Sequence, residues 1–506
     1  MEGIKSSNKT IAINTFYLYL RMFVQLAISL YTSRIILREL GIVDYGINNV
    51  VSSLLSMLTF IQGSLSSSAS RFLAFEIGKG ERGDINLVFC TTLNIHIIFS
   101  VILVVLSETI GLWYFYNKLV IPEDRYFAAL VVYQISVLSS VLSLIVVPYN
   151  AMIIAQERMK AFAYLNIINV LFKLLVAYVL CITPIDKLIT NSVLGFLLSL
   201  LVNVMYYLYC KRNFNTCNFH KVWDKEQFSE MMTYSGWSIL SYSPIVVSQL
   251  TNLLINAFFG PVVNAARAVS TTVQQSVNSF VLNFQVALNP QIIKNYAAND
   301  DKRVSQLVVM SQKITLLLIL VLFLPLLTNI EYVLRLWLTE VPEYSEMMVF
   351  FVAINGVFLS IINPLGVLAS AANKIKIYNL VTTPYYLLSV VAAYIALRCG
   401  ADLTITFVIF MLFDILSYVV IVLTLKRAAL ISAKQQLYVY FKVLASLTLA
   451  ILGGYIIRLL PLGGFVGFIS KASLAEIVAI LTILTIIVTK DEIKALKNIV
   501  KSKINK

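Results

Sequence analysis

Long apolar stretches alternate with short polar segments along almost the whole chain of 506 residues. Most of these stretches reach about 20 residues, the length that an α-helix needs to cross about 30 Å of hydrocarbon. The pattern therefore predicts an all-α integral membrane protein with about fourteen transmembrane helices. The expected spans are residues 11–37, 43–66, 87–110, 127–154, 161–183, 186–209, 232–258, 262–288, 307–330, 347–372, 377–397, 403–425, 438–460 and 470–489.

The composition agrees with a membrane protein. Hydrophobic residues make up 59% of the chain and charged residues only 13%, whereas a soluble domain carries about 25% charged residues. The net charge of +14 would suggest nucleic-acid binding in a soluble protein. Here the basic residues lie mostly in short loops and in the C-terminal segment, so membrane topology explains them better and no nucleic-acid partner is expected.

The basic residues also predict the orientation. The N-terminal segment, every second loop and the C-terminal segment hold 25 Lys and Arg residues, and the segments on the opposite side hold eight. Cytoplasmic loops carry the excess of Lys and Arg in membrane proteins, so both termini are expected in the cytoplasm. Six basic residues fall inside the expected spans: Arg21, Arg34, Lys173, Arg267, Lys313 and Lys442.

The chain contains an internal repeat. Residues 41–85 align without a gap with residues 260–304, so that each residue number differs from its partner's by 219. A second match aligns residues 148–160 with residues 364–376, where the difference is 216. Six spans separate the copies, and an even number of spans preserves orientation, so the copies are expected to be parallel and related by an axis along the membrane normal.

The repeat predicts how the chain is divided. Residues 1–210 form one six-helix lobe, residues 211–230 a basic cytoplasmic linker, and residues 231–430 the second six-helix lobe. Residues 431–506 supply two further spans and a basic tail. Two parallel lobes around a central cleft can rock to give alternating access, so the symmetry favours a transporter over a channel or an enzyme.

Several expected spans carry polar residues on one face. Polar side chains at steps of three, four or seven share a helix face, and they cannot face lipid without a large cost. They indicate either hydrogen bonding between helices or a hydrated cavity lined by the first, second, seventh and eighth spans. The residues in question are Arg21 and Gln25 on the first span, Asn48 and Asn49 on the second, and Asn264, Arg267, Thr271, Gln274 and Asn278 on the eighth.

The charged residues within the spans favour an anionic substrate. Arg21 and Arg267 are expected either to contact an anion or to form structural ion pairs, since an arginine at bilayer depth is costly and usually functional. Lys173 is central in its span, and Arg34 lies near the outer end of the first span, where it could also extend to the interface. Asp414 is a candidate for proton or Na⁺ coupling, or for pairing with a base such as Lys173.

Motifs for other chemistry are missing from the sequence. No segment matches the phosphate-binding pattern GxxxxGK[ST], so an ATP-driven pump is not expected. The two histidines, His96 and His220, have no carboxylate at motif spacing, and the five cysteines match no zinc spacing. No cofactor, no metal and no enzymatic activity are therefore predicted.

The sequence resembles the Wzx-type polysaccharide flippases of the multidrug/oligosaccharidyl-lipid/polysaccharide exporter superfamily. The likeness lies in NTFYLYLRMFVQLAISLYTSRIILRELGIVDYGINNVV (residues 14–51), SSSASRFLAFEIGKG (66–80) and AQERMKAFAYLNIINVLFKL (155–174). The resemblance implies a MATE-like fold in the bacterial inner membrane. It also implies a substrate: an oligosaccharide repeat unit, of O-antigen or capsule type, linked to undecaprenyl diphosphate. Membrane lipids and other polysaccharide-assembly proteins are the implied partners.

In the related lipid II flippases, basic residues on helices 1, 2 and 8 line the cavity. Arg21 and Arg267 match that placement on the first and eighth spans, whereas the second span has Asn48 and Asn49 and no arginine. The resemblance therefore implies a substrate other than lipid II. Two alternatives stay open. A MATE-type exporter of organic cations would need carboxylates in the cavity, and a glycan-processing membrane enzyme would need a catalytic acid–base set.

Overall fold

The computed structural model describes residues 2–56, 60–156, 158–218, 220, 224–372, 374–427 and 431–487, and every regular element in these ranges is helical. The contacts of these residues define two compact units. The first comprises the described residues up to Ala268 together with Trp337–Glu343. The second comprises Val269–Leu336 and the described residues from Tyr344 onward. The long helix α10 (Ser243–Ala297) contributes to both units.

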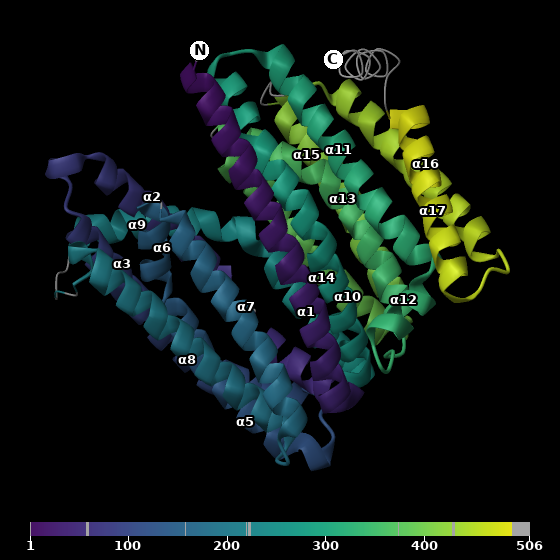
Figure 1. Ribbon diagram of the computed structural model, residues 1–506, viewed down its shortest axis with the longest axis horizontal. Helices are drawn as coiled ribbons and strands as arrows, with labels where there is room; N and C mark the ends of the chain where they lie inside the picture. Colours follow the sequence, from purple (N-terminus) through teal and green to yellow (C-terminus); the bar gives the residue numbers. More distant parts are fainter. Residues whose placement is uncertain are drawn as a thin grey trace. The chain divides into compact units, whose positions relative to one another are not determined.

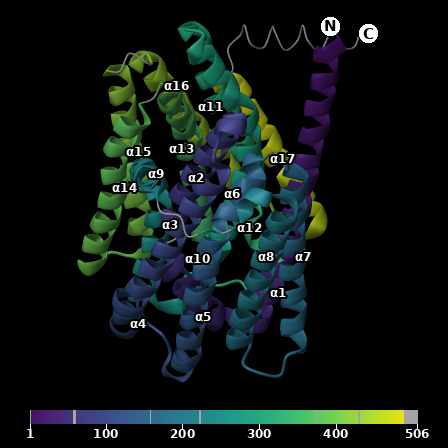
Figure 2. The same ribbon diagram turned by 90° about the vertical axis from the view of Figure 1, so that its left-hand side faces the viewer.

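The first unit is built from α1–α9 and the first part of α10. Apolar side chains of α1, such as Ile47, pack against side chains of α5 and α8, such as Val132 and Leu188, and form a buried core. Figure 2 shows α7 and α8 lying side by side, joined by a short loop. The helices are α1 (Glu2–Ser56), α2 (Phe60–Gly78), α3 (Ile85–Leu106), α4 (Leu112–Lys118), α5 (Tyr126–Ile145), α6 (Val147–Ala155), α7 (Met159–Ile182), α8 (Lys187–Asn213) and α9 (Lys225–Ile239).

The second unit continues from the later part of α10. Helix α11 packs against α13, α16 and α17, and Figure 1 shows the last two helices, in yellow, running beside it. Helix α14 packs against α15. The helices are α11 (Asp301–Thr328), α12 (Ile330–Trp337), α13 (Ser345–Ala371), α14 (Ile375–Arg398), α15 (Leu403–Arg427), α16 (Ala433–Arg458) and α17 (Gly464–Thr482). Short 3₁₀ turns cover Gly80–Arg82, Glu123–Arg125, Asn215–Cys217 and Leu240–Tyr242, and π turns cover Ser107–Gly111 and Ile483–Ile487.

Two glycines break the longest helices at equivalent points of the repeat. Gly41 in α1 has φ 75° and ψ 170°, and Gly260 in α10 has φ 78° and ψ −175°. This region of backbone space is essentially restricted to glycine. The first sequence match aligns these two glycines with each other. The same unusual conformation at both positions is what the repeat predicts.

Helix boundaries follow the second match. Four pairs of helix ends are separated by the same offset as residues 148 and 364, although the paired segments have little sequence in common. Both members of each pair begin or end a helix next to a short loop, so the repeat extends through the last two helices of each copy. The pairs are Ala155 and Ala371, Met159 and Ile375, Ile182 and Arg398, and Lys187 and Leu403.

The ungapped alignment of residues 41–85 with 260–304 is wrong at its end. Helices α2 and α10 end at aligned residues, Gly78 and Ala297. The residues that cap α3 and α11, Asp84 and Asp300, instead follow the offset of the second match. Each carboxylate accepts a hydrogen bond from an N–H three residues ahead, at 2.9 Å in α3 and 3.0 Å in α11. The second copy of this loop is therefore three residues shorter, and the offset changes there.

The number of candidate spans depends on how the kinked elements are divided. In the described residues, eleven helices are long and apolar enough to cross a membrane, or twelve if one bent pair counts as a single span. Two expected pairs share kinked elements: residues 11–37 and 43–66 fall on α1 and α2, and residues 232–258 and 262–288 fall on α9 and α10. Gly41 and Gly260 have non-helical backbone angles, so each kink lies at the point where the two expected spans divide.

Candidate functional site

The polar face of α10 extends through both units. Asn264 and Arg267 belong to the first unit, and Thr271, Gln274 and Asn278 belong to the second. The two groups of side chains have different surroundings, and each takes part in a network inside its own unit.

In the first unit, three of the expected polar faces meet in one buried network. The Nδ2 group of Asn264 donates to the carbonyl oxygen of Asn252 at 2.9 Å, and Nδ2 of Asn252 donates to Oγ of Ser53 at 2.9 Å. Ser53 in turn donates to the carbonyl oxygen of Asn49 at 2.8 Å. Asn264 is fully buried. For these residues the structure shows hydrogen bonding between helices, one of the two interpretations of the polar faces.

Arg267 lies one turn beyond Asn264 on the same helix. Only 8% of its surface is exposed, although a guanidinium group is normally hydrated. Asn48, on the helical segment after Gly41, is half-buried. Among the predicted basic residues whose side chains the structure describes, Arg267 is the most deeply buried, and it lies within a helix that qualifies as a membrane span.

The second unit contains a chain of polar side chains from three helices. Gln274 on α10 donates through Nε2 to Oδ1 of Asn355 on α13 at 3.1 Å. Asn355 donates through Nδ2 to Oδ2 of Asp414 on α15 at 2.8 Å. Asp414 is 7% exposed. Its hydrogen-bond partner within this unit is thus a neutral amide. Thr271 and Asn278 are half-buried on the same helix as Gln274.

The other predicted site residues lie at more accessible positions. Gln25 and Arg34 on α1 and Lys173 on α7 are exposed within their unit. The side chain of Arg21 lies outside the part of the chain that the structure describes. The structure therefore brings the side chain of Asn264 and the backbone carbonyl of Asn49 into one network, and the side chains of Gln274 and Asp414 into another.

A cluster of ion pairs that the sequence did not predict joins three parts of the first unit. The guanidinium of Arg125 donates through Nε to Asp44 at 2.8 Å and through Nη1 to Asp186 at 2.6 Å. Asp186 also caps α8, since it accepts from the N–H groups of Leu188 at 3.0 Å and Ile189 at 3.1 Å. Residues 44, 125 and 186 are far apart in the sequence, so no local pattern connects them.

Asp186 lies in the loop between α7 and α8, just before the candidate span that begins at Lys187. Burial raises the pKa of the Asp186 carboxyl group. The hydrogen bonds from Arg125 and from the backbone N–H groups of α8 lower it by more, so the pKa lies below its usual value. The carboxylate therefore stabilises the folded loop in its charged form.

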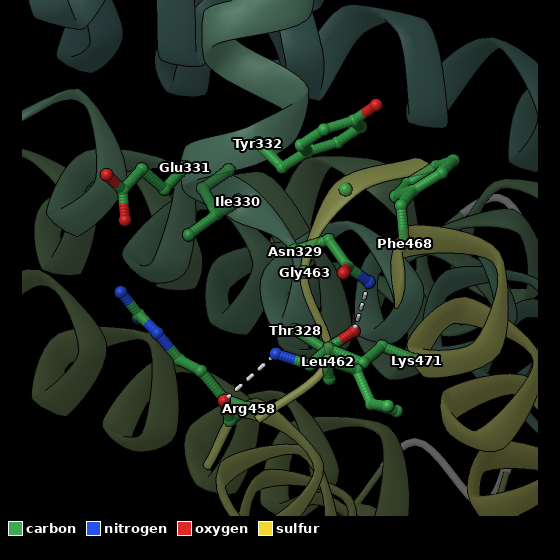
Figure 3. Close-up of a pocket in the computed structure, with 11 residues that line it drawn as sticks. Thr328, Asn329, Ile330, Glu331, Tyr332, Arg458, Leu462, Gly463, Phe468 and Lys471 are labelled. Atoms are coloured by element: carbon green, nitrogen blue, oxygen red, sulfur yellow. Dashed lines mark hydrogen bonds between the residues drawn. The ribbon is translucent and has the colours of Figure 1, made fainter. Parts of the chain in front are cut away.

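Two cavities lie away from these networks. One, in the first unit between α2 and α9, has a volume of about 1110 Å³ and is lined by Arg71, whose guanidinium lies 4.4 Å from the ring centre of Tyr234. The other, of about 230 Å³, lies in the second unit near the ends of α11 and α16 (Figure 3). There, Lys471 donates to the carbonyl oxygen of Arg458 at 3.2 Å, and the rings of Tyr332 and Phe468 stack 5.2 Å apart.

Comparisons with solved structures identify the fold. The chain resembles a multidrug-resistance MATE family transporter of the MOP superfamily in its inward-facing conformation, with 13% identity, a TM-score of 0.61, and coverage of 78% of this chain and 95% of that one. It also resembles the MATE multidrug transporter DinF-BH, with 17% identity, a TM-score of 0.58, and coverage of 83% and 94%. Identities this low establish the fold alone.

A third similar structure is a MOP superfamily transporter from Pyrococcus furiosus, with 12% identity, a TM-score of 0.51, and coverage of 93% and 94%. Its reported description states that the reverse polarity of its binding pocket suggests a different function. No curated protein matches the chain.

The sequence itself matches a protein family. Residues 11–283, more than half of the chain, match the family described as "Polysaccharide biosynthesis protein". The match includes α2–α9, most of α1 and α10, and both glycine breaks. The chain therefore belongs to the polysaccharide biosynthesis protein family, and it is a multi-pass membrane protein with the fold of MOP superfamily transporters.

Proposed function

We propose that the protein is a flippase of the bacterial inner membrane that moves undecaprenyl-diphosphate-linked oligosaccharide repeat units, of O-antigen or capsule type, from the inner to the outer leaflet. The family match supports a role in polysaccharide biosynthesis, and the fold supports transport. Diphosphate and sugar groups cannot cross hydrocarbon unaided because their polar atoms would lose their hydrogen bonds to water. The prenyl chain can remain in lipid while the polar head passes through the protein.

The observation that carries this proposal is the burial of Arg267. Placing an arginine within a membrane helix costs about 2.5–3.5 kcal/mol, so an arginine at this depth is a candidate for function. The planar guanidinium binds phosphate oxygens in pairs. Asn264 and Arg267 lie on one face of α10, next to the position where the chain passes from the first unit to the second. In the proposal, Arg267 holds the diphosphate, with Arg21, Arg34 and Lys173 as further candidates.

The internal repeat supports the proposed mode of transport. The two glycine breaks are separated by the 219 residues of the first match, and four pairs of helix ends are separated by the 216 residues of the second match. Both findings are expected for two related lobes. We take residues 1–210 and 231–430 as these lobes, with both termini in the cytoplasm. Outward movement of an anion in an inside-negative potential gains about 2.3 kcal/mol per charge for each 100 mV, so the membrane potential assists the proposed direction.

Asp414 is the proposed coupling residue. Its carboxylate lies in a buried site where the described partner is the amide of Asn355. A buried, charged carboxylate with only a neutral partner is high in free energy, and binding of a proton or a sodium ion lowers that free energy. In this scheme, the network that links α10, α13 and α15 responds to occupation of Asp414.

The proposal is tested by complementing a deletion strain with variants of Arg267. Arg267→Ala is expected to reduce surface polysaccharide by about tenfold or more, because a charged hydrogen bond contributes about 1.5–3 kcal/mol. Lipid-linked repeat units should accumulate in the cells. Arg267→Lys should retain part of the activity. The control is Arg335→Ala, which removes an exposed arginine paired with Glu331. Normal surface polysaccharide in Arg267→Ala, with the variant present in the membrane, would overturn the assignment.

The second candidate is an exporter of organic cations. Two structurally similar proteins are multidrug transporters, and the buried carboxylate of Asp414 is the feature of this chain that would suit a cation. Expression of the protein in a drug-sensitive strain separates the two functions. Resistance that depends on Asp414, together with normal polysaccharide in the deletion strain, would favour the exporter.

A further inference from the structure

The groove between α11 and α16 lies outside both polar networks. Its volume is about 250 Å³. One wall comes from α11, and the other comes from the first of the two additional C-terminal helices, which lies outside the repeat. Both helices belong to the second unit and pack against each other.

The lining combines positive charge with apolar surface. Lys313 on α11 and Lys442 on α16 both line the groove, and both are half-buried. None of the described residues that line it is acidic. The Nζ atom of Lys442 lies 4.7 Å from the ring centre of Tyr438, which also lines the groove. The remaining lining includes the aliphatic side chains of Leu316 and Val443.

The back of the groove is held by buried hydrogen bonds. Gln312 donates through Nε2 to the carbonyl oxygen of Ile361 at 2.8 Å and to Oε1 of Gln436 at 3.0 Å. Tyr418, which is fully buried, donates to the carbonyl oxygen of Gln436 at 2.9 Å. These bonds join α11 to α13 and α16, and α15 to α16, so they hold the wall of the groove in place.

Further polar atoms extend the site toward the start of α16. Gln435 accepts from Oγ of Ser305 at 2.8 Å through its side-chain oxygen, so its amide nitrogen can donate to a ligand. With the two ammonium groups, the groove then offers three side chains that donate hydrogen bonds. An anion with several acceptor oxygens fits this set.

The depth of the lysines agrees with the headgroup region of a bilayer. Lys313 and Lys442 come six and four residues after the starts of their expected spans at residues 307 and 438. At about 1.5 Å per residue, that is about 6–9 Å along each helix. The positive-inside rule puts these ends in the cytoplasmic leaflet. Exposed apolar side chains next to the groove, Tyr438 and Phe441, are 61% and 66% exposed and can contact acyl chains.

We propose that this groove is a specific site for an anionic phospholipid of the cytoplasmic leaflet, whose phosphate is bound by Lys313 and Lys442 and whose acyl chains lie along α16. Phosphate oxygens can accept hydrogen bonds from the two ammonium groups, and the apolar lining accepts the lipid chains. The site is independent of the cavity proposed for transport. It gives the first of the two additional helices a role as one wall of a lipid site.

The test is native mass spectrometry of the purified full-length protein in detergent. The probes are phosphatidylglycerol, phosphatidylcholine with the same acyl chains, and inorganic phosphate. We expect one phosphatidylglycerol to remain bound at concentrations where phosphatidylcholine does not. Lys313→Gln/Lys442→Gln should weaken this binding about tenfold or more, since each basic residue near the surface contributes about 1 kcal/mol to the attraction of anionic lipid.

Lys434→Gln is the matched control, because Lys434 is an exposed lysine on α16 that does not line the groove. It should leave phosphatidylglycerol binding unchanged. If the double variant does not fold, the single variant Lys442→Gln is measured instead, and it should also weaken phosphatidylglycerol binding. Equal binding of both lipids, binding of inorganic phosphate alone, or an equal loss of binding in Lys434→Gln would each overturn the proposal.

Discussion

Asp186 combines two stabilising roles in one carboxylate. It pairs with Arg125 and it caps α8 through two backbone N–H groups. Asparagine caps helices about as well as aspartate, so Asp186→Asn removes the charge and keeps an acceptor for the cap. We expect the variant to lower the apparent melting temperature in detergent at neutral pH, because Arg125 then keeps Asp44 as its carboxylate partner and loses the other.

The pH dependence of this effect has a definite sign. The pKa of Asp186 is lower in the folded protein than its usual value, so its contribution is present above about pH 4 and is lost as the pH falls through the folded value. The melting temperatures of the wild type and Asp186→Asn should therefore converge in acid. A gap that stays constant from neutral to acidic pH would contradict the role of the charge.

Asp414→Asn tests the proposed coupling. The amide keeps a polar group beside Asn355 but cannot gain or lose a proton at ordinary pH. We expect export of polysaccharide to fall, and the remaining export no longer to change when the proton or sodium gradient is collapsed. Surface polysaccharide is measured with and without an ionophore in both strains. If the variant keeps the full dependence on the gradient, Asp414 is not the coupling site.

The role of a single polar residue was predictable from the sequence where it belonged to a series of polar residues at helical spacing. Asn264 and Gln274 were recognised in this way, and the structure places each in a hydrogen-bond network. Asn355 was missed, because it is an isolated polar residue within an apolar span. It nevertheless joins Gln274 to Asp414. The partners of Arg125 could not be predicted because they come from distant segments.

The glycine breaks are the clearest feature at the level of helices. Alanine at Gly41 or Gly260 would meet no crowding, since at most one side-chain atom lies as near as 4.0 Å to an added Cβ. The cost is therefore conformational, about 1–3 kcal/mol for each substitution. We expect Gly41→Ala and Gly260→Ala to lower the apparent melting temperature to a similar extent.

Gly195→Ala is the matched control for these two variants. Gly195 lies within α8, and an added Cβ there also meets nothing within 4 Å. Alanine favours a helix interior over glycine by about 0.5–1 kcal/mol, so this substitution should be neutral or stabilising. Thermal unfolding in detergent compares the three variants. An equal effect of all three would show that the positive φ angles of Gly41 and Gly260 carry no special cost.

The positions of the helices were largely predictable, and some of their ends were not. Expected spans such as 403–425 lie within the observed helix α15. However, hydropathy identifies only the apolar part of a helix that suits lipid. It does not show polar turns that extend the helix beyond that part. Helix α10 therefore continues to Ala297, beyond the expected end at residue 288. The kinks at Gly41 and Gly260 lie between the two expected spans that α1 and α10 each carry.

For the whole molecule, the sequence pattern predicted an all-α membrane protein, and the family resemblance implied a MATE-like fold. The comparisons confirm this fold and the family. The repeat predicted equivalent helix ends in the two copies, and the observed bounds agree at the four pairs given above, whereas the offset changes in the loop before α3 and α11. The substrate is not determined by the fold, since proteins with this fold include multidrug transporters. It depends on the charge of a few side chains, above all Arg267.

Transport by the purified protein tests the central proposal most directly. Proteoliposomes would carry an undecaprenyl-diphosphate-linked oligosaccharide with a fluorescent label, and a reducing agent added outside would bleach the labels that reach the outer leaflet. We predict rapid loss of the protected signal with the wild type. With Arg267→Ala, the rate of this loss should fall by about tenfold or more. Equal rates in the two proteins, or no movement beyond that of protein-free liposomes, would contradict the account.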